Sequence, residues 1–273
     1  MLYLCATPIG NLGDITLRVV ETLRACDAVY CEDTRHTGML LNHLGIKKPL
    51  ISCHQHNEKQ RAEEIVPLLA AGQELVYASD AGMPGISDPG AALVAACVAH
   101  DLPFTVLPGA SAVLTAAVLS GLPPQPFTFY GFLPRETKPA REVLADLANC
   151  GHLALLYESP QRVQKTLSAL LNACGDRQAA VLRELTKKFE EARRGLLSEL
   201  IPQYDTPPKG ECVLAIYCPR ENRSVDPSDL DAFLTKALGE GIRVKDAAAQ
   251  AALALNLPKN QAYQRALELG KSI

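Results

Sequence analysis

The sequence predicts two α/β domains followed by a small helical module. Three observations lead to this fold class. Strand-like and helix-like segments alternate from the N-terminus as far as Cys218. A proline-rich break divides that alternation, and the C-terminal part of the chain shows no strand pattern. We therefore expect domains at residues 1–121 and 122–220 and a helical module at residues 226–273.

The first domain is expected to hold four strands and four helices. Short apolar runs indicate buried strands, and apolar residues spaced by three or four indicate helices. Asp14 is a candidate N-cap for the first helix, in which Val19 and Leu23 would share one face. The predicted strands are Leu2–Thr7, Asp27–Asp33, Glu74–Ser79 and Pro103–Pro108, and the predicted helices are Asp14–Ala25, Ala62–Gly72, Gly90–His100 and Gly109–Gly121.

The second domain begins at SGLPPQPF (Ser120–Phe127), where three prolines in four residues exclude a continuing helix. The polar, turn-rich segment Pro219–Asp229 is typical of a linker. Three short helices are expected beyond it, at Leu230–Leu238, Val244–Leu255 and Gln261–Leu269. In the second domain the predicted strands are Phe127–Phe132, His152–Glu158, Gln178–Glu184 and Glu211–Cys218, with one helix ending at Leu147 and another at Pro160–Gly175.

Length and composition exclude several classes of protein. The 273 residues are 48% apolar and 21% charged, which is typical of folded soluble domains. No apolar run reaches the roughly 18–20 residues of a membrane helix, and the first residues lack the features of a signal peptide. The nine cysteines form no CxxC pair, so we expect reduced core thiols and a cytoplasmic protein. The formal charge of −3 argues against a nonspecific nucleic-acid coat but allows a local basic groove.

Four segments place a Gly/Pro-rich turn directly after a predicted strand. Ligands of α/β sheets bind outside the carboxyl ends of strands, where glycines let the backbone approach them closely. Each turn alone also fits an ordinary connection, but four in one chain suggest a single bound organic molecule. GxGxxG and GxxxxGK(S/T) are both absent, which disfavours Rossmann dinucleotide enzymes and P-loop NTPases. The segments are Thr7–Asp14, Ser79–Gly90, Leu107–Ala112 and Tyr157–Pro160.

Longer motifs surround these turns, in the order TPIGNLGDIT, DAVYCEDTRHTGMLL, SDAGMPGISDPG, PGASA, YESPQR, RELTK and KGECVLAI. Together they closely resemble the ribosomal RNA small subunit methyltransferase I family of the tetrapyrrole-methylase superfamily. The resemblance runs from Leu2 to the C-terminal helices. It implies two α/β domains with S-adenosylmethionine in the cleft between them, a homodimer, and 2′-O-methylation of a cytidine ribose in small-subunit (16S) ribosomal RNA. The first loop reads IGNLGD instead of GxGPGD, which suits the ribosomal RNA branch better than the porphyrin branch.

The resemblance also implies which residues contact the cofactor, motif by motif. They belong to the first loop, to the segment after the third strand of the first domain, to the turn after PG, and to two strand ends of the second domain. These residues are Leu12, Ala78, Ser79, Asp80, Met83, Ser111, Ala112, Tyr157 and Leu185.

Methyl transfer to a hydroxyl needs close alignment of the reacting atoms and no metal, and a general base could add about 10²–10⁴-fold. Glu32 and Asp33 are the candidate bases, although side chains alternate on a strand and at most one should face the cleft. In the alternative reading both are structural, and one of them pairs with Arg35. His36 has a suitable intrinsic pKa but equally fits a surface residue. The CHQH string at Cys53–His56 lacks a second ligand pair, so we expect no metal site.

RNA phosphates need basic side chains near the cleft entrance, and the C-terminal helices resemble a helix-turn-helix. These helices equally fit a packing or dimer module. The expected partners are small-subunit ribosomal RNA in the assembled 30S subunit and a second copy of the chain, with no membrane. Candidate RNA contacts are Arg35, Arg135, Lys138, Arg141, Lys187, Lys188 and Lys259, each of which also fits a solvated surface charge.

Two other functions fit parts of the pattern. A methyltransferase of the same superfamily could act on a tetrapyrrole or another small molecule, although it would need neither an RNA-sized entrance nor a helical tail. A non-catalytic RNA-binding or ribosome-assembly protein could keep a vestigial pocket, although four intact ligand loops argue against it.

Overall fold

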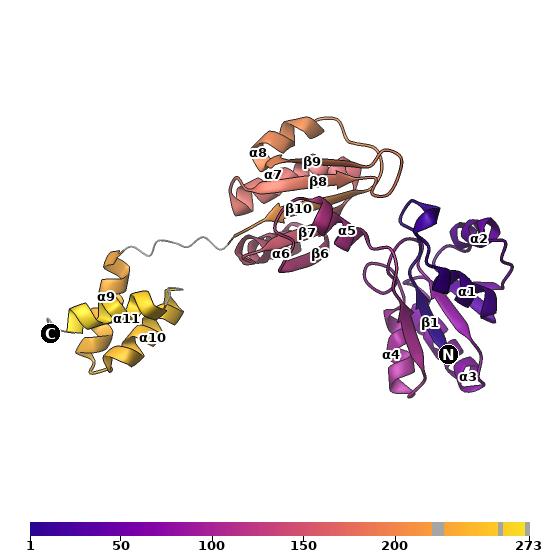
Figure 1. The fold of residues 1–273 in the computed structure, drawn as a ribbon, viewed down its shortest axis with the longest axis horizontal. Helices are drawn as coiled ribbons and strands as arrows, with labels where there is room; N and C mark the ends of the chain where they lie inside the picture. The colour runs from indigo at the N-terminus through magenta and orange to yellow at the C-terminus, as the bar shows by residue number, and fades with distance from the viewer. Residues whose placement is uncertain (220–226, 256–258, 271–273) are drawn as a thin grey trace. The chain divides into compact units, whose positions relative to one another are not determined.

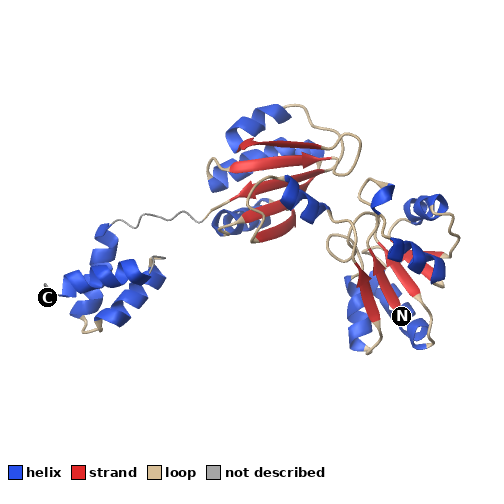
Figure 2. Ribbon diagram, viewed as in Figure 1, coloured by secondary structure: helices blue, strands red, loops and turns tan. Residues whose placement is uncertain are grey.

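The computed structural model describes residues 1–219, 227–255 and 259–270, and the chain divides into two compact units, Met1–Pro219 and Arg220–Ile273 (Figure 1). The first unit holds two five-stranded sheets with helices packed on them (Figure 2). Within the described residues, no helix is both long enough and apolar enough to cross a membrane. All nine cysteines lie in the first unit as free thiols.

The first sheet is parallel throughout, with the strand order β3-β2-β4-β1-β5. Its register brings the strand ends level, because Cys5 lies opposite both Ala78 and Leu107, and Cys31 lies opposite Ala78. The turns that follow these strands therefore lie along one edge of the sheet, where α/β proteins bind ligands. The strands are β1 (Leu2–Cys5), β2 (Ala28–Cys31), β3 (Leu50–Ser52), β4 (Leu75–Ala78) and β5 (Phe104–Leu107).

Helices cover both faces of this sheet, which explains why its strands are apolar on both sides. Leu4 and Tyr77 pack with α3 and α4 on one face, whereas Cys5 and Val76 pack with α1 and α2 on the other. The helices are α1 (Leu17–Ala25), α2 (Thr34–His43), α3 (Glu58–Ala70) and α4 (Ala91–Ala99).

The first helix begins later than expected. Asp14 ends a short 3-10 turn, η1 (Leu12–Asp14), whose start is capped by the Asn11 side chain. Thr16 is the N-cap of α1, because its hydroxyl accepts a hydrogen bond from the N–H of Val19 at 3.2 Å. The prediction of Asp14 as the cap is therefore wrong, since an N-cap must directly precede the helix to reach its free N–H groups.

The second sheet has the strand order β6-β7-β10-β8-β9, and only the β6–β7 pair is parallel. Helices α6, α7 and α8 pack on one face. Helix α5 precedes the expected break at residue 121, yet its Val113 and Ala116 pack against Leu155 and Val213 on the other face. The elements are α5 (Ala112–Leu119), β6 (Phe127–Phe132), α6 (Thr137–Asn149), β7 (Leu153–Glu158), η2 (Pro160–Arg162), α7 (Val163–Cys174), β8 (Gln178–Arg183), β9 (Glu191–Leu196), α8 (Leu197–Leu200), η3 (Ile201–Tyr204) and β10 (Cys212–Tyr217).

The second unit contains the three expected helices. Leu234 and the alanines of the second and third helices form its core, where small side chains allow the helices to pack closely. Arg265 ties the third helix to the first by donating two hydrogen bonds of 2.6 Å to the Asp231 carboxylate. Residues 220–226 of the expected linker lie outside the described residues. The helices are α9 (Pro227–Gly239), α10 (Val244–Ala254) and α11 (Lys259–Gly270).

Candidate functional site

The turns after β1 and β4 are joined to each other. Thr7 and Gly82 exchange backbone hydrogen bonds of 3.0 and 3.1 Å, which form an isolated antiparallel bridge. The Thr7 hydroxyl also donates to the carbonyl oxygen of Ser79 at 2.9 Å. These contacts hold two of the four expected ligand loops in a fixed position at the carboxyl edge of the sheet.

A cavity of about 720 Å³, the larger cavity, lies beside this bridge and is lined by both sheets of the first unit. All four expected loops contribute to it. The second sheet adds an aromatic wall, in which the Tyr157 ring lies edge-on to Phe129 and Phe132 at centroid distances of 4.7 and 5.5 Å. Apolar rings on one side and small loop residues on the other make a slot that fits a flat organic group.

The nine residues expected at the cofactor divide into two groups. Ala78 and Ser79 are buried in the strand end, Leu12 lies on η1 with 46% of its surface exposed, and Asp80 lines a neighbouring pocket. These four do not line the larger cavity. The five that line it are Met83, Ser111, Ala112, Tyr157 and Leu185.

The larger cavity is also acidic, which the sequence did not reveal. Among the described residues, Asp88, Glu158 and Glu211 line it and no Lys, Arg or His side chain does, although Arg162 lies 3.5 Å from Glu158 and Lys187 lies 2.7 Å from Glu211. Burial raises the pKa of Asp88 to about 6, and the nearby carboxylates of Glu32 and Asp80 add to the shift. The only sequence signal for Asp88 was its place in SDPG, at the end of a ligand loop. The Asp88 carboxylate therefore favours a ligand that carries positive charge.

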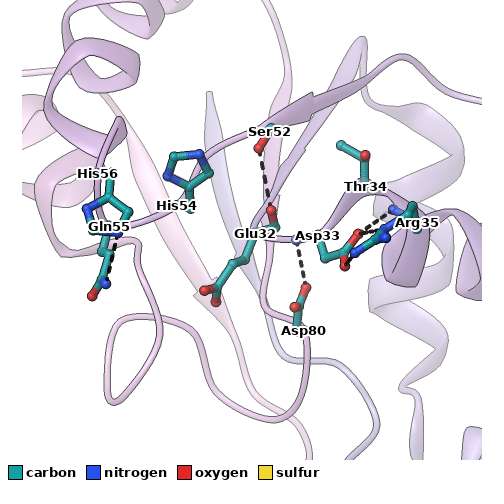
Figure 3. A pocket seen from close by; sticks show the side chains of 9 residues that line it. All are labelled: Glu32, Asp33, Thr34, Arg35, Ser52, His54, Gln55, His56 and Asp80. Atoms are coloured by element: carbon teal, nitrogen blue, oxygen red, sulfur yellow. Dashed lines mark hydrogen bonds and ion pairs between the residues drawn. The ribbon is translucent and has the colours of Figure 1, made fainter.

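A second hollow of about 510 Å³, the smaller pocket, lies where β2, β3 and β4 end (Figure 3). It adjoins the larger cavity, because Asp80 lines one and Ala81 the other, and because Glu32 and Asp80 influence the pKa of Asp88. Its lining residues are Glu32, Asp33, Thr34, Arg35, Ser52, His54, Gln55, His56 and Asp80.

Asp33 has a structural role in this pocket. Its carboxylate is the N-cap of α2, accepting from the Arg35 N–H at 2.8 Å, and also accepts from the Arg35 guanidinium at 2.7 and 3.1 Å (Figure 3). The hydrogen bonds from Arg35 hold the pKa of Asp33 well below its usual range. A carboxylate held ionised in this way is a poor general base, so the pairing reading of Asp33 is the one that the geometry supports.

Glu32 differs from its neighbour. Across residues 1–219, 227–255 and 259–270, no group donates a hydrogen bond to its carboxylate, which points away from the Asp33–Arg35 pair (Figure 3). Asp80 instead accepts from the Asp33 N–H at 3.2 Å. The Nδ1 atom of His54 is buried without a partner in the same described part of the chain. The pocket thus offers a carboxylate that has no donor among the described residues, whereas this ring nitrogen is buried within the protein.

The basic residues expected to contact RNA have different surroundings. Lys187 is tied to Glu184 and Glu211 at 2.9 and 2.7 Å, so its charge is already compensated. Arg35 is paired with Asp33. Lys188 lies 5.7 Å from the centre of the exposed Phe189 ring. The remaining four, Arg135, Lys138, Arg141 and Lys259, are exposed.

His54 and His56 from the CHQH string line the smaller pocket, whereas Cys53 is buried in the core. In the part of the chain that the structure describes, no group of three or more His, Cys, Asp or Glu side chains could hold a metal ion.

Comparison with known proteins decides the family. The family model described as Tetrapyrrole (Corrin/Porphyrin) Methylases matches residues 1–201. "Ribosomal RNA small subunit methyltransferase I" of Streptococcus pyogenes serotype M1 is 42% identical over 97% of this chain and 93% of its own. The chain belongs to the ribosomal RNA small subunit methyltransferase I family of tetrapyrrole methylases. The resemblance seen in the motifs is thereby confirmed.

Other matches agree with this family. The proteins of the same name from Synechocystis sp. (strain ATCC 27184 / PCC 6803 / Kazusa) and Bacillus subtilis (strain 168) are 43% and 40% identical, over 98% and 96% of this chain and 98% and 92% of their own. A model described as "RsmI C-terminal HTH domain" matches residues 224–270. The crystal structure of diphthine synthase, 16% identical, superposes with a TM-score of 0.61 over 79% of this chain and 89% of that chain. These matches confirm the predicted fold class, two α/β domains of methylase type and a helical module.

Proposed function

We propose that the protein transfers a methyl group from S-adenosylmethionine to the 2′-hydroxyl of a cytidine in small-subunit ribosomal RNA. The observation that carries this proposal is the match to relatives named ribosomal RNA small subunit methyltransferase I along nearly the whole chain. The larger cavity supports it independently, because its lining fits the donor.

S-adenosylmethionine is a cation with a flat adenine ring, and both properties have counterparts in the lining of the larger cavity. Asp88 offers a carboxylate to the positive charge, and no basic side chain of the lining opposes it. Tyr157 and Phe129 offer an apolar wall to the ring, while Ser111 and Ala112 let it approach the loop. When bound, S-adenosylmethionine supplies a methyl group that its sulfonium already activates.

The remaining task of the protein is to align the acceptor and remove its proton. Alignment supplies most of the acceleration of such a displacement. Of the two acids expected as the base, Asp33 is occupied by Arg35, and Glu32 lies in the smaller pocket rather than in the larger cavity. We assign the proton to the Asp88 carboxylate, because it lines the larger cavity on the side of Glu32 and Asp80, and burial raises its pKa to about 6.

RNA would approach past exposed cations and an exposed aromatic ring. Arg135, Lys138 and Arg141 lie around the start of α6, and Lys188 and Phe189 lie on the loop between β8 and β9. Lysine and arginine contact phosphates, and an exposed ring can stack on an unpaired base. We further propose that the helical unit contacts the assembled 30S subunit and that the protein acts in the cytoplasm.

A second copy of the chain would cover apolar side chains on the edge strand β5 and on helices α4 and α5. Val98, Phe104, Val106, Leu114 and Val118 are large and exposed there, although such residues are usually buried. Light scattering should give twice the chain mass of 29.4 kDa. A monomer at micromolar concentration would contradict the homodimer.

Labelled S-adenosylmethionine tests the function when it is offered with isolated small subunits and with naked ribosomal RNA, side by side. Digestion of the product should place the label on a 2′-O-methylated cytidine. No label in either RNA, with the cofactor still bound in calorimetry, would refute the RNA substrate and favour a small-molecule acceptor.

A further inference from the structure

The smaller pocket contains hydrogen-bonding groups to which the proposed methyl transfer assigns no role. Its walls are mostly hydrogen-bonding groups, among them Glu32, Ser52, His54 and Gln55. It adjoins the larger cavity through Asp80. A group bound in the smaller pocket would therefore lie next to S-adenosylmethionine bound in the larger cavity. The pocket is therefore the natural place for the part of the acceptor that lies next to the reacting ribose.

The charge of the smaller pocket decides between a phosphate and a base. Glu32, Asp33 and Asp80 face it. Arg35, the only Lys or Arg among the described residues of its lining, is neutralised by Asp33 at 2.7 Å. A phosphate would be repelled by the remaining acids. An uncharged nucleobase would not, and it could use the hydrogen-bonding groups of the walls.

Glu32 is the group best placed to distinguish one base from another. Its carboxylate has no donor in the described part of the chain, and Figure 3 shows it turned to the side of the pocket where His54 and Gln55 lie. An ionised carboxylate can only accept hydrogen bonds. Cytosine presents an exocyclic amine that donates, whereas uracil presents an oxygen that accepts at the equivalent position.

We propose that the smaller pocket holds the base of the acceptor cytidine and that Glu32 selects cytosine by accepting a hydrogen bond from its exocyclic amine. The inference rests on the proposed function. Glu32 is thus a specificity residue, and its role differs from that of a general base. A base contact of this kind gives a preference of roughly 5- to 150-fold over a base that cannot make it.

The test compares two acceptors that differ only at the methylated position. Small subunits are reconstituted with RNA that carries either cytidine or uridine there, and the two are mixed in one reaction with labelled S-adenosylmethionine. The ratio of the two products gives the preference. Glu32→Gln replaces an acceptor with a group that can also donate to uracil, while Glu32→Ala removes the contact. Glu63→Gln is the matched control, because it makes the same change on the exposed surface of α3.

We expect Glu32→Gln to reduce the preference for cytidine at least about fivefold, partly through a gain on uridine. Glu32→Ala should reduce the preference only by slowing methylation of the cytidine acceptor. Both variants should bind S-adenosylmethionine as tightly as the wild type in calorimetry, which also shows that they fold, and Glu63→Gln should keep the wild-type ratio.

A Glu32→Gln variant that is slower on both acceptors with an unchanged ratio would overturn the inference, because that result indicates proton transfer or a structural role. A wild type that shows no preference between the two acceptors would overturn it as well. A wild type that labels neither RNA would refute the proposed function itself, and the inference with it.

Discussion

Replacement of Asp88 by asparagine should stabilise the free protein and weaken the binding of S-adenosylmethionine. Burial, together with the charges of Glu32 and Asp80, raises the pKa of Asp88 from 3.8 to about 6. The folded protein therefore binds this proton more tightly than the unfolded chain does. At neutral pH the ionised carboxylate destabilises the folded state, and an asparagine, which carries no charge, would not.

The size of the effect follows from that shift. A change of about two pKa units corresponds to roughly 3 kcal/mol at most. Asp88 is only partly buried, so solvent screening leaves about 1–2 kcal/mol. The folded state binds more protons than the unfolded chain between about pH 4 and pH 6, so the wild type loses this stability as the pH rises through that window. The variant has no titrating carboxyl at this position. The difference in free energy of unfolding between the two proteins should therefore appear as the pH rises through this window.

Urea unfolding at about pH 4 and about pH 7.5 measures this gap. Asp88→Asn should be more stable than the wild type at the higher pH and nearly equal at the lower. Asp14→Asn, the same change at an exposed aspartate, is the control. Calorimetry should show a loss of affinity for S-adenosylmethionine of about tenfold or more, because a charged partner is removed. A variant no more stable than the wild type at pH 7.5, or a gap that persists at pH 4, would refute the reasoning.

Three other changes test separate parts of the structure. Glu158→Gln should lower the free energy of unfolding by about 2–3 kcal/mol, because its buried carboxylate accepts a hydrogen bond of 2.6 Å from Thr166; an unchanged urea midpoint would contradict this. Tyr157→Ala should weaken S-adenosylmethionine binding about tenfold in calorimetry and Tyr263→Ala should not; equal affinities would show that the ring makes no contact with the cofactor. A chain that ends at Ser224 should keep its affinity for S-adenosylmethionine and bind small subunits more weakly, whereas loss of cofactor binding would refute this division of labour.

The fold was largely predictable because its strands are buried and apolar. Short apolar runs located four strands of each sheet, and the alternation with helices fixed the α/β class. Strand β9 (Glu191–Leu196) was missed because its sequence, EARRGL, has no apolar alternation. It is an edge strand whose conformation depends on pairing with β8, a contact that the local sequence does not show. The three residues of β3 gave too short a pattern to recognise.

The site was predictable from its loops and not from its walls. Glycine- and proline-rich turns after strands located four of the loops that line the larger cavity. Phe129 and Phe132 were missed because they belong to β6 of the second sheet, and only the packing of that sheet brings them to the loops of the first. Asp88 was missed because its distinguishing property, a raised pKa, arises from burial and from the charges of Glu32, which is distant in sequence, and of Asp80, which lies in the same loop. The carbonyl oxygen of Ser79 accepts a hydrogen bond from the Thr7 hydroxyl, and a contact of Ser79 with the cofactor stays a prediction.

The position of bound S-adenosylhomocysteine, determined by crystallography of the full-length protein, tests the central claim most directly. The account predicts density in the larger cavity, with the adenine ring against Tyr157 and the sulfur on the side of Asp88 that faces the smaller pocket. Density at any other site, or an empty larger cavity at saturating ligand, would contradict the account.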